Sequence, residues 1–183
     1  RIYLDVIIQT ASEYQETRAC VRMIERSDQR DVILVADRGY ENYNIMAHAD
    51  QKGWKYVIRI KDVNSNGIAS ALDLPHAGSF DTDVTLTFTR KNNKKTKAAG
   101  YRWMPQNQMF DYLPPKSEDT YTLPFRIARF KISDENYEVV VTNLDRSQFP
   151  SKNLKEIYQL RWGIETSFRE LKYAIGVTCF HAK

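Results

Sequence analysis

The sequence of 183 residues contains only 2 cysteines and 3 histidines, and none of its apolar runs is long enough to cross a membrane. Cys20 and Cys179 are too few for a disulfide framework, and the histidines lie far apart, without zinc-ligand spacing. A spanning helix needs about 20 consecutive apolar residues. These absences exclude a disulfide-stapled secreted domain, a zinc domain and a membrane-spanning protein, and they predict a reducing cytoplasm as the setting.

Glycine and proline are also scarce, at 7 and 6 residues, which excludes collagen and low-complexity disorder. The remaining composition is 42% hydrophobic and 27% charged, enough for a chain of this length to bury a sizeable core. Lys and Arg number 27 against 23 Asp and Glu, so the net charge is +4. This mild excess is only a weak indication of an anionic partner.

Strand and helix patterns alternate at the start of the chain, over residues 1–9, 12–28, 32–36, 44–52 and 56–60. Ser12 is a candidate N-cap of the first helix, and Gly53 is placed to end the second. The continuous apolar run Val32–Ala36 is typical of a strand that is buried on both faces and paired in parallel. This order predicts an α/β fold, with helices packed on a mixed sheet.

The composition and periodicity of the sequence change over residues 63–148, which hold five of the six prolines, several strand-like runs and no long amphipathic helix. We therefore expect a β-rich insertion there, between a first part of the core over 1–62 and a C-terminal core helix within 149–183. Inside it, Arg90–Lys97 is a basic turn that either contacts a DNA backbone or is merely solvated. Trp103 and Tyr137 could stack on an unpaired base, but core packing is the favoured interpretation of both.

One helix is predicted from Asn153 to about Ala174, and its apolar stripe is expected to face the core; the stripe comprises Ile157, Leu160, Ile164, Phe168, Leu171 and Ile175. A polar stripe of four side chains runs beside it: Tyr158, Arg161, Glu165 and Lys172. A solvated face with a weak i,i+4 ion pair is the simpler interpretation. The alternative is that this edge presents functional groups into a groove beside the sheet.

Asp37 directly follows the apolar strand Val32–Ala36. Ligands gather outside the carboxyl ends of strands in α/β sheets, and a carboxylate there can hold a divalent cation. The alternative is that Asp37 and Gly39 only shape a turn. Asp62, after the next strand, is a weaker candidate of the same kind.

The spacing of Tyr158, Arg161, Glu165 and Lys172 resembles the Y-R-E-K signature of bacterial insertion-sequence DDE transposases. The segment Val32–Tyr40, an apolar strand followed by Asp-Arg-Gly-aromatic, is similar to the region around that family's second catalytic Asp. The resemblance implies a ribonuclease-H-like mixed sheet flanked by helices, with a β-rich insertion before the last helix.

The resemblance also implies residue roles. Asp37 and Glu165 would be the second and third catalytic carboxylates and ligands of Mg²⁺, or of Mn²⁺ in its place. Three further residues would contact phosphates of the transposon end: Tyr158, Arg161 and Lys172. In the family order the first catalytic Asp precedes Arg1, and Asp5 lies on the next strand, so the chain as given is expected to lack one metal ligand and to be inactive.

The implied activity is metal-dependent phosphodiester hydrolysis and strand transfer, with double-stranded DNA as the partner and a homodimer as the active assembly. The expected location is the bacterial cytoplasm, in association with the nucleoid and not with a membrane. Two alternatives stay open: a ribonuclease-H-like nuclease without strand transfer, and a derivative that binds DNA without cutting it.

Overall fold

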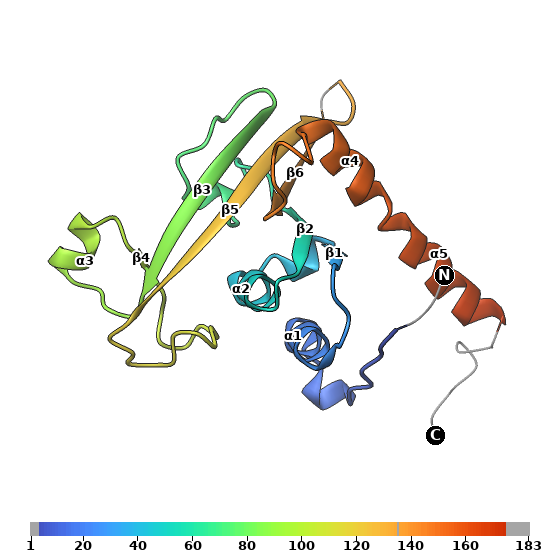
Figure 1. The fold of residues 1–183 in the computed structure, drawn as a ribbon, viewed down its shortest axis with the longest axis horizontal. Coiled ribbons are helices and arrows are strands. Elements are labelled where there is room, and N and C mark those ends of the chain that lie inside the picture. Colours follow the sequence, from blue (N-terminus) through green and yellow to red (C-terminus); the bar gives the residue numbers. More distant parts are fainter. Residues whose placement is uncertain (1–3, 135, 175–183) are drawn as a thin grey trace.

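The computed structural model describes residues 4–134 and 136–174, which form a six-stranded mixed sheet with helices on both faces (Figure 1). In chain order the elements are η1 (Ala11–Glu13), α1 (Glu16–Arg26), β1 (Ile33–Ala36), η2 (Arg38–Tyr40), α2 (Tyr43–Gln51), β2 (Lys55–Ile60), η3 (Ala69–Ala71), β3 (Phe80–Thr89), α3 (Lys94–Ala98), β4 (Arg102–Trp103), β5 (Thr120–Lys131), β6 (Tyr137–Thr142), α4 (Ser151–Gln159) and α5 (Trp162–Ala174).

The strand order across the sheet is β1-β2-β6-β5-β3-β4. Strands β1 and β2 run parallel, as do β3 and β4, and the three pairings between them are antiparallel. The α/β prediction is therefore confirmed, and a mixed sheet flanked by helices is consistent with a ribonuclease-H-like fold.

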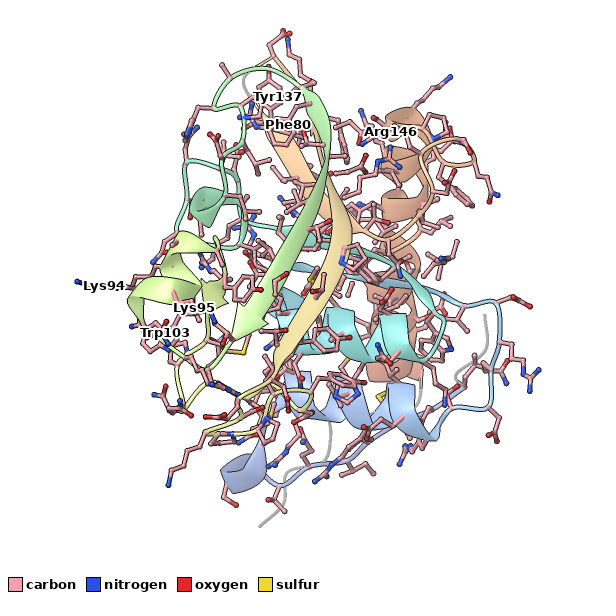
Figure 2. The ribbon with its side chains drawn as sticks, turned by 60° about the vertical axis from the view of Figure 1, so that its left-hand side comes forward. Phe80, Lys94, Lys95, Trp103, Tyr137 and Arg146 are labelled. Carbon is pink, nitrogen blue, oxygen red and sulfur yellow. The ribbon has the colours of Figure 1, made fainter. Side chains whose placement is uncertain are left out.

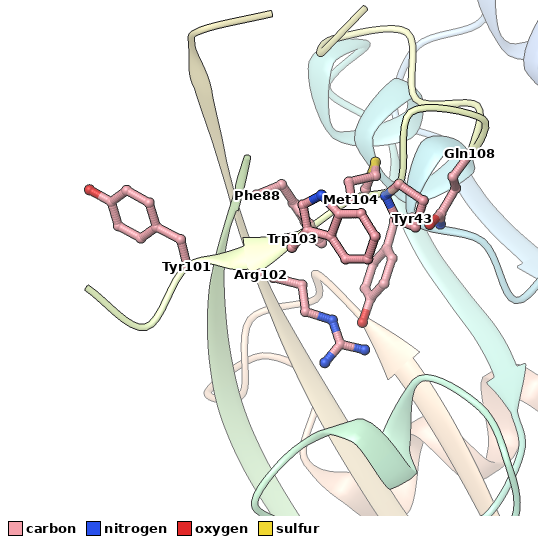
Figure 3. Close-up of a pocket in the computed structure, with 8 residues that line it drawn as sticks. Tyr43, Phe88, Tyr101, Arg102, Trp103, Met104 and Gln108 are labelled. Carbon is pink, nitrogen blue, oxygen red and sulfur yellow. The ribbon is translucent and has the colours of Figure 1, made fainter. Parts of the chain in front are cut away.

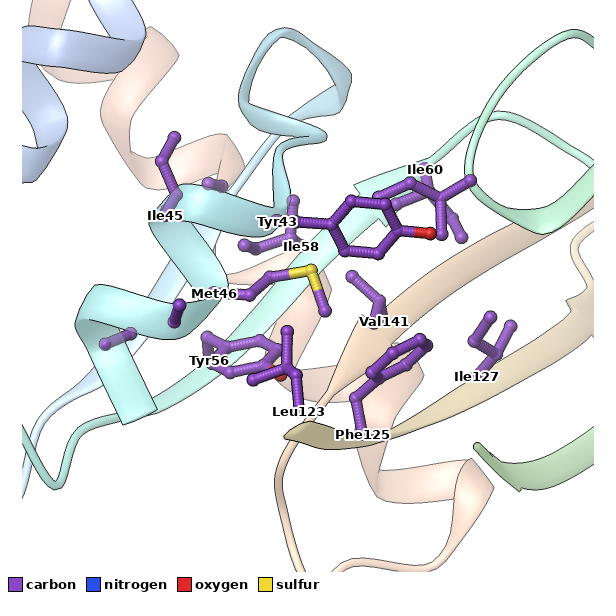
Figure 4. Close-up of a cluster of buried hydrophobic side chains, with 14 of the residues drawn as sticks. Tyr43, Ile45, Met46, Tyr56, Ile58, Ile60, Leu123, Phe125, Ile127 and Val141 are labelled. Atoms are coloured by element: carbon purple, nitrogen blue, oxygen red, sulfur yellow. The ribbon is translucent and has the colours of Figure 1, made fainter. Parts of the chain in front are cut away.

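The main hydrophobic core lies between one face of the sheet and helix α2 (Figure 4). Side chains alternate between the two faces of a strand, so Ile58 and Val141 point into this core while their neighbours Val57 and Val140 point the other way. Every residue of α2 from Tyr43 to Ala49 is buried, because α1 covers the side of α2 that faces away from the sheet. A helix that is apolar almost all round suits such a sandwiched position.

Helix α4 covers the opposite face of the sheet. Leu154 and Tyr158, one turn apart on α4, are 0% and 2% exposed and pack on Val57, Val140 and neighbouring side chains. This second, smaller cluster attaches α4 to β1, β2 and β5.

The strand predicted over residues 1–9 is wrong for residues 4–9, which are irregular. Their alternating apolar side chains are exposed: Leu4 by 73%, Val6 by 72% and Ile8 by 93%. Alternation makes a strand only where a sheet edge accepts it, and the described strands leave this segment unpaired. The helix that follows begins at Glu16 with Gln15 as its N-cap, so Ser12 does not cap it.

Strand β1 was expected to be buried on both faces, and this is also wrong. Among the strands of residues 4–134 and 136–174 it lies at the edge of the sheet and pairs in parallel with β2, and Ile33 is 37% exposed. A continuous apolar run shows that a strand can be buried, but its position in the sheet decides how much of it is covered.

The C-terminal helix is not continuous, because a tight turn at Leu160–Arg161 separates α4 from α5. There the amides of Leu160 and Arg161 donate to the carbonyls three residues earlier, at 3.1 and 3.0 Å. The predicted core stripe is wrong in its middle, since Leu160 is 73% and Ile164 is 52% exposed. The buried face is rotated toward Leu154 and Tyr158; the side chains of Phe168 and Leu171, with Gly176 and Ile175, lie outside the described part of the chain.

The strands expected within residues 63–148 are present as β3, β5 and β6. Strand β6 pairs antiparallel with β2 from Val57 opposite Thr142 to Ile60 opposite Val139, so these strands extend the sheet that β1 and β2 begin. The description of this segment as an insertion stays a prediction.

Candidate active site

Asp37 lies at the carboxyl end of β1, as the sequence predicts, and its side chain is exposed. Its Oδ1 accepts a hydrogen bond from the backbone N–H of Gly39 at 2.8 Å, which makes Asp37 the N-cap of the short helix η2. A Cβ at position 39 would lie 3.2 Å from that same oxygen, so glycine allows the chain to turn tightly beneath the carboxylate. Asp37 thus shapes a turn and still leaves Oδ2 for a ligand.

A second carboxylate, Glu16, lies beside this turn, and the sequence analysis missed it. Its Oε2 is 3.8 Å from the position that a Cβ on Gly39 would take. The two acids are far apart in sequence, so their spacing carries no signal of their proximity. Burial, followed by the negative charges of Glu16 and other neighbours including Asp37, raises the pKa of Tyr40 to about 12. Negative charge is therefore concentrated at the end of β1.

Arg161 and Glu165 are brought together at the start of α5. Arg161 Nη1 donates to Glu165 Oε1 at 2.6 Å, and the Arg161 and Glu165 side chains are 13% and 42% exposed. The guanidinium carbon lies 5.0 Å from the ring centre of Trp162, and Arg161 Nε is buried without a hydrogen-bond partner in the described structure. The planar guanidinium of an arginine can pair two N–H groups with two oxygens of a phosphate, so Arg161 has the donor set for such a contact.

Tyr158 is a core residue as well as a predicted phosphate contact. Its ring is buried against the sheet, and its hydroxyl has no hydrogen-bond partner within the described residues. The Arg161 guanidinium carbon lies 5.7 Å from the ring centre. Lys172 belongs to α5, but its side chain lies outside what the structure describes.

The segments that carry Asp37 and Glu165 are linked through one hydrophobic cluster. Val35 on β1 packs against the cluster that includes Tyr158 on α4. Asp37 follows Val35 by two residues, and Glu165 follows Tyr158 by seven, beyond the turn at Leu160–Arg161. The elements that precede the two acids therefore lie against the same cluster, and a direct meeting of the two carboxylates stays a prediction.

The described residues include no group of three or more His, Cys, Asp or Glu side chains arranged to hold a metal ion. Asp62, the weaker candidate, is engaged elsewhere: both of its oxygens accept from the guanidinium of Arg129, at 2.8 and 2.9 Å. Hydrogen bonds from Arg129 also hold the pKa of Asp62 below its usual value. Asp5 is likewise paired, with Arg26 at the end of α1. Carboxylate oxygens suit a hard divalent cation, so the side chains of Asp37 and Glu165 are of the right chemical type to bind one, and that they share an ion stays a prediction.

The basic segment 90–97 is only partly a solvated turn. Arg90 is 4% exposed and donates to three backbone carbonyls of the loop after β4, so it is a structural residue. Asn93 and Thr96 form a capping box that starts helix α3, a helix the sequence analysis did not predict. Lys94 and Lys95 project from that helix on the same side of the molecule as Trp103 (Figure 2).

Trp103 is 45% exposed, so the expectation that it packs in the core is wrong. It lines a cavity of about 510 Å³ with Arg102 and Tyr43, whose buried hydroxyl has no hydrogen-bond partner in the described structure (Figure 3). Tyr137 is half-buried, and the guanidinium carbon of Arg129 lies 3.9 Å from its ring centre. The exposed aromatic and basic groups of α3 and β4 thus form a surface, here called the α3–β4 surface: Lys94, Lys95, Lys97, Tyr101 and Trp103.

A mixed sheet flanked by helices, with one acid after an edge strand and another on a C-terminal helix, is an arrangement suited to metal-dependent phosphodiester chemistry. The family described as "Transposase DDE domain" matches residues 1–182. The chain therefore belongs to the DDE transposase family. The family implies an enzyme that acts on DNA and uses divalent metal ions.

No curated protein sequence matches the chain. Among the described residues, no helix is long and apolar enough to cross a membrane.

Proposed function

We propose that this chain is the catalytic part of a Y-R-E-K insertion-sequence transposase, which hydrolyses a phosphodiester at each transposon end and joins the freed 3′-OH to target DNA. The observation that carries the proposal is that Val35, two residues before Asp37, packs against the cluster that includes Tyr158 on α4, the helix that precedes the one bearing Glu165. The family match over residues 1–182 supports the same conclusion.

In this proposal Asp37 and Glu165 are ligands of Mg²⁺, with Mn²⁺ able to replace it. The ions supply Lewis-acid stabilisation of the attacking and leaving oxygens of an in-line displacement. We propose that a third acidic ligand completes the site. With Asp37 and Glu165 alone, metal is expected to bind weakly and DNA is not expected to be cut.

Arg161 has two partners in the proposed cycle. Without DNA it holds Glu165 through the 2.6 Å ion pair, which keeps the carboxylate oriented beside the helix. A phosphate that competes with Glu165 for the Arg161 guanidinium draws this group away from the carboxylate, which is then free to bind metal. Lys172 lies seven residues after Glu165, about two turns further along α5, and adds a point charge, while Tyr158, whose ring is buried on the sheet, is the third proposed phosphate contact.

The α3–β4 surface is proposed as a second DNA contact. Its exposed lysines would meet backbone phosphates, which position a duplex without reading its sequence. Arg90 is excluded from this role because it is buried against backbone carbonyls.

The proposal is tested with the full-length gene product, a labelled transposon end and target DNA. Asp37→Asn and Glu165→Gln should each lower cleavage by more than about 100-fold, because even hydrogen-bond partners of metal ligands are worth about 10–100-fold. Glu170→Gln, an exposed acid on the same helix, is the matched control and should retain cleavage. Wild-type cleavage by either active-site variant would refute the metal-ligand assignment.

The products of the same reaction separate the alternatives. Joined end–target products indicate a transposase, nicks alone indicate a nuclease, and binding without either indicates a non-catalytic derivative. A dimer on paired ends, measured by light scattering with and without DNA, tests the proposed homodimeric assembly.

A further inference from the structure

A buried charged network surrounds the first turn of α4. Asp81 on β3 accepts hydrogen bonds from Arg126 on β5, through Nε at 2.6 Å and through Nη2, and from the hydroxyl of Ser151, the first residue of α4. Arg126 is 2% exposed, and its Nη1 donates to the carbonyl of Phe149 at 2.7 Å. Arg146, labelled in Figure 2, adds contacts to Asp81 from the loop that precedes α4.

This network lies beside the start of α4, which has no side-chain cap hydrogen bond of its own. The N-cap residue of α4 is Pro150, whose side chain cannot accept a hydrogen bond from the first-turn amides. The carboxylate of Asp81 instead binds Ser151 and places negative charge beside the positive end of the helix dipole. Because the guanidinium of Arg126 is planar and makes a two-point contact with Asp81, the network restrains direction as well as distance.

The restraint extends along the helix to the candidate active site. Leu154 and Tyr158 fix the rotation of α4 on the sheet, and backbone hydrogen bonds continue from Tyr158 through Arg161 into α5. None of the described side chains of α5 belongs to either hydrophobic cluster. Ser167 on α5 is 6% exposed, so packing of α5 and the placement of α4 both contribute to the direction of the segment that carries Glu165.

We propose that Asp81, acting through Arg126 and Ser151, is a positioning residue that aims the helix bearing Arg161 and Glu165 at the end of β1. It couples strand β3, far from Asp37 in sequence, to the placement of the third carboxylate. Its importance for the reaction rests on the proposed function, whereas the anchoring of the helix does not.

The role of the Asp81–Ser151 hydrogen bond is tested with a conservative variant of Ser151 and a matched control. Ser151→Ala removes the hydroxyl that binds Asp81 and leaves the Asp81–Arg126 pair intact, whereas Ser151→Thr keeps a hydroxyl. Spin labels at exposed Tyr173 on α5 and exposed Thr85 on β3, with both native cysteines replaced by serine, report the direction of the helix by pulsed electron resonance. Ser151→Ala and Asp81→Asn should broaden the distance distribution about twofold, and Ser151→Thr should match wild type.

Hydrogen exchange provides a second readout that needs no labels. The loss of one charge-assisted hydrogen bond should speed amide exchange in the first turn of α4 by about tenfold in Ser151→Ala. If Ser151→Ala and Asp81→Asn both fold with unchanged distances and unchanged exchange, Asp81 contributes only stability and the proposal is overturned. If Asp81→Asn fails to fold, the comparison of Ser151→Ala with Ser151→Thr still tests the proposal.

The link to catalysis is measured in the full-length protein. Ser151→Ala should lower kcat for end cleavage several-fold more than it raises KM, because the DNA contacts remain while Glu165 is less often aligned. Unchanged kcat in a variant whose helix has moved would overturn the link to the reaction. Failure of the metal-ligand assignment at Asp37 and Glu165 would leave the label distances unaffected, so the two ideas fail separately.

Discussion

Replacing Asp81 by Asn should destabilise the chain at neutral pH and lose most of that effect in acid. The Asp81 side chain is 18% exposed; burial raises its pKa, but hydrogen bonds from Arg126 and Ser151 outweigh this and lower the pKa from 3.8 to about 2. That displacement corresponds to about 2 kcal/mol of stability. Because Asn also leaves the charge of Arg126 buried without its partner, the total loss expected at pH 7 is about 3 kcal/mol.

The sign follows from the direction of the pKa change. A carboxylate whose pKa is depressed by folding stabilises the native state fully above its unfolded pKa, near 3.8, and loses this contribution as the pH falls toward its folded value of about 2. Wild type should therefore lose stability relative to Asp81→Asn between about pH 4 and pH 2.

Urea titrations of the purified chain, followed by tryptophan fluorescence at pH 7, 5 and 3, measure this difference. Asp134→Asn is the control, because Asp134 is fully exposed and forms a surface ion pair with nearby Lys131, and it should leave unfolding unchanged. A difference below about 1 kcal/mol at pH 7 would refute the reasoning about the buried pair. A difference that stays constant from pH 7 to pH 3 and below would refute the pKa argument.

Two further substitutions test the local packing. Arg90→Met should lower the free energy of unfolding in urea by about 2–3 kcal/mol, because it removes the donors of three backbone carbonyls between residues 105 and 113. Lys94→Ala should leave stability unchanged and lower the salt slope of DNA binding by about 1. The reverse pattern would reassign Arg90 to the DNA surface. Gly67→Ala should lower thermal stability by about 1–3 kcal/mol, because its Cβ would lie 2.5 Å from Glu41 Oε1; an unchanged melting midpoint would show that the Glu41 side chain moves aside freely.

Much of the fold is predictable from periodicity alone. Helix α2 and strand β2 lie within a residue of their predicted bounds, and Gly53, with a φ of 74°, ends the helix as expected. The runs that became β3, β5 and β6 are also visible in the sequence. These elements are recognisable because their apolar spacing follows the geometry of one helix or one strand, which is a local property.

The candidate site is predictable in part for the same reason. Arg161 and Glu165 are four residues apart, so a single turn of helix brings them together whatever the rest of the fold does. Asp37 follows a recognisable strand, and its place at the carboxyl end of that strand is again local. Glu16, by contrast, comes beside Asp37 only through the packing of α1, and no spacing rule predicts it.

By itself the sequence determined which segments are helices or strands, and the order in which the acidic and basic groups occur along them. Only the tertiary structure decided that β1 is an edge strand, that Arg90 is buried, and that Asp81 and Arg126 pair across two strands to hold the start of α4. The reason is that the hydrophobic effect is non-directional. An apolar pattern therefore shows that a side chain can be buried, but not which other element buries it. Charged groups then pair with whatever the topology brings within reach.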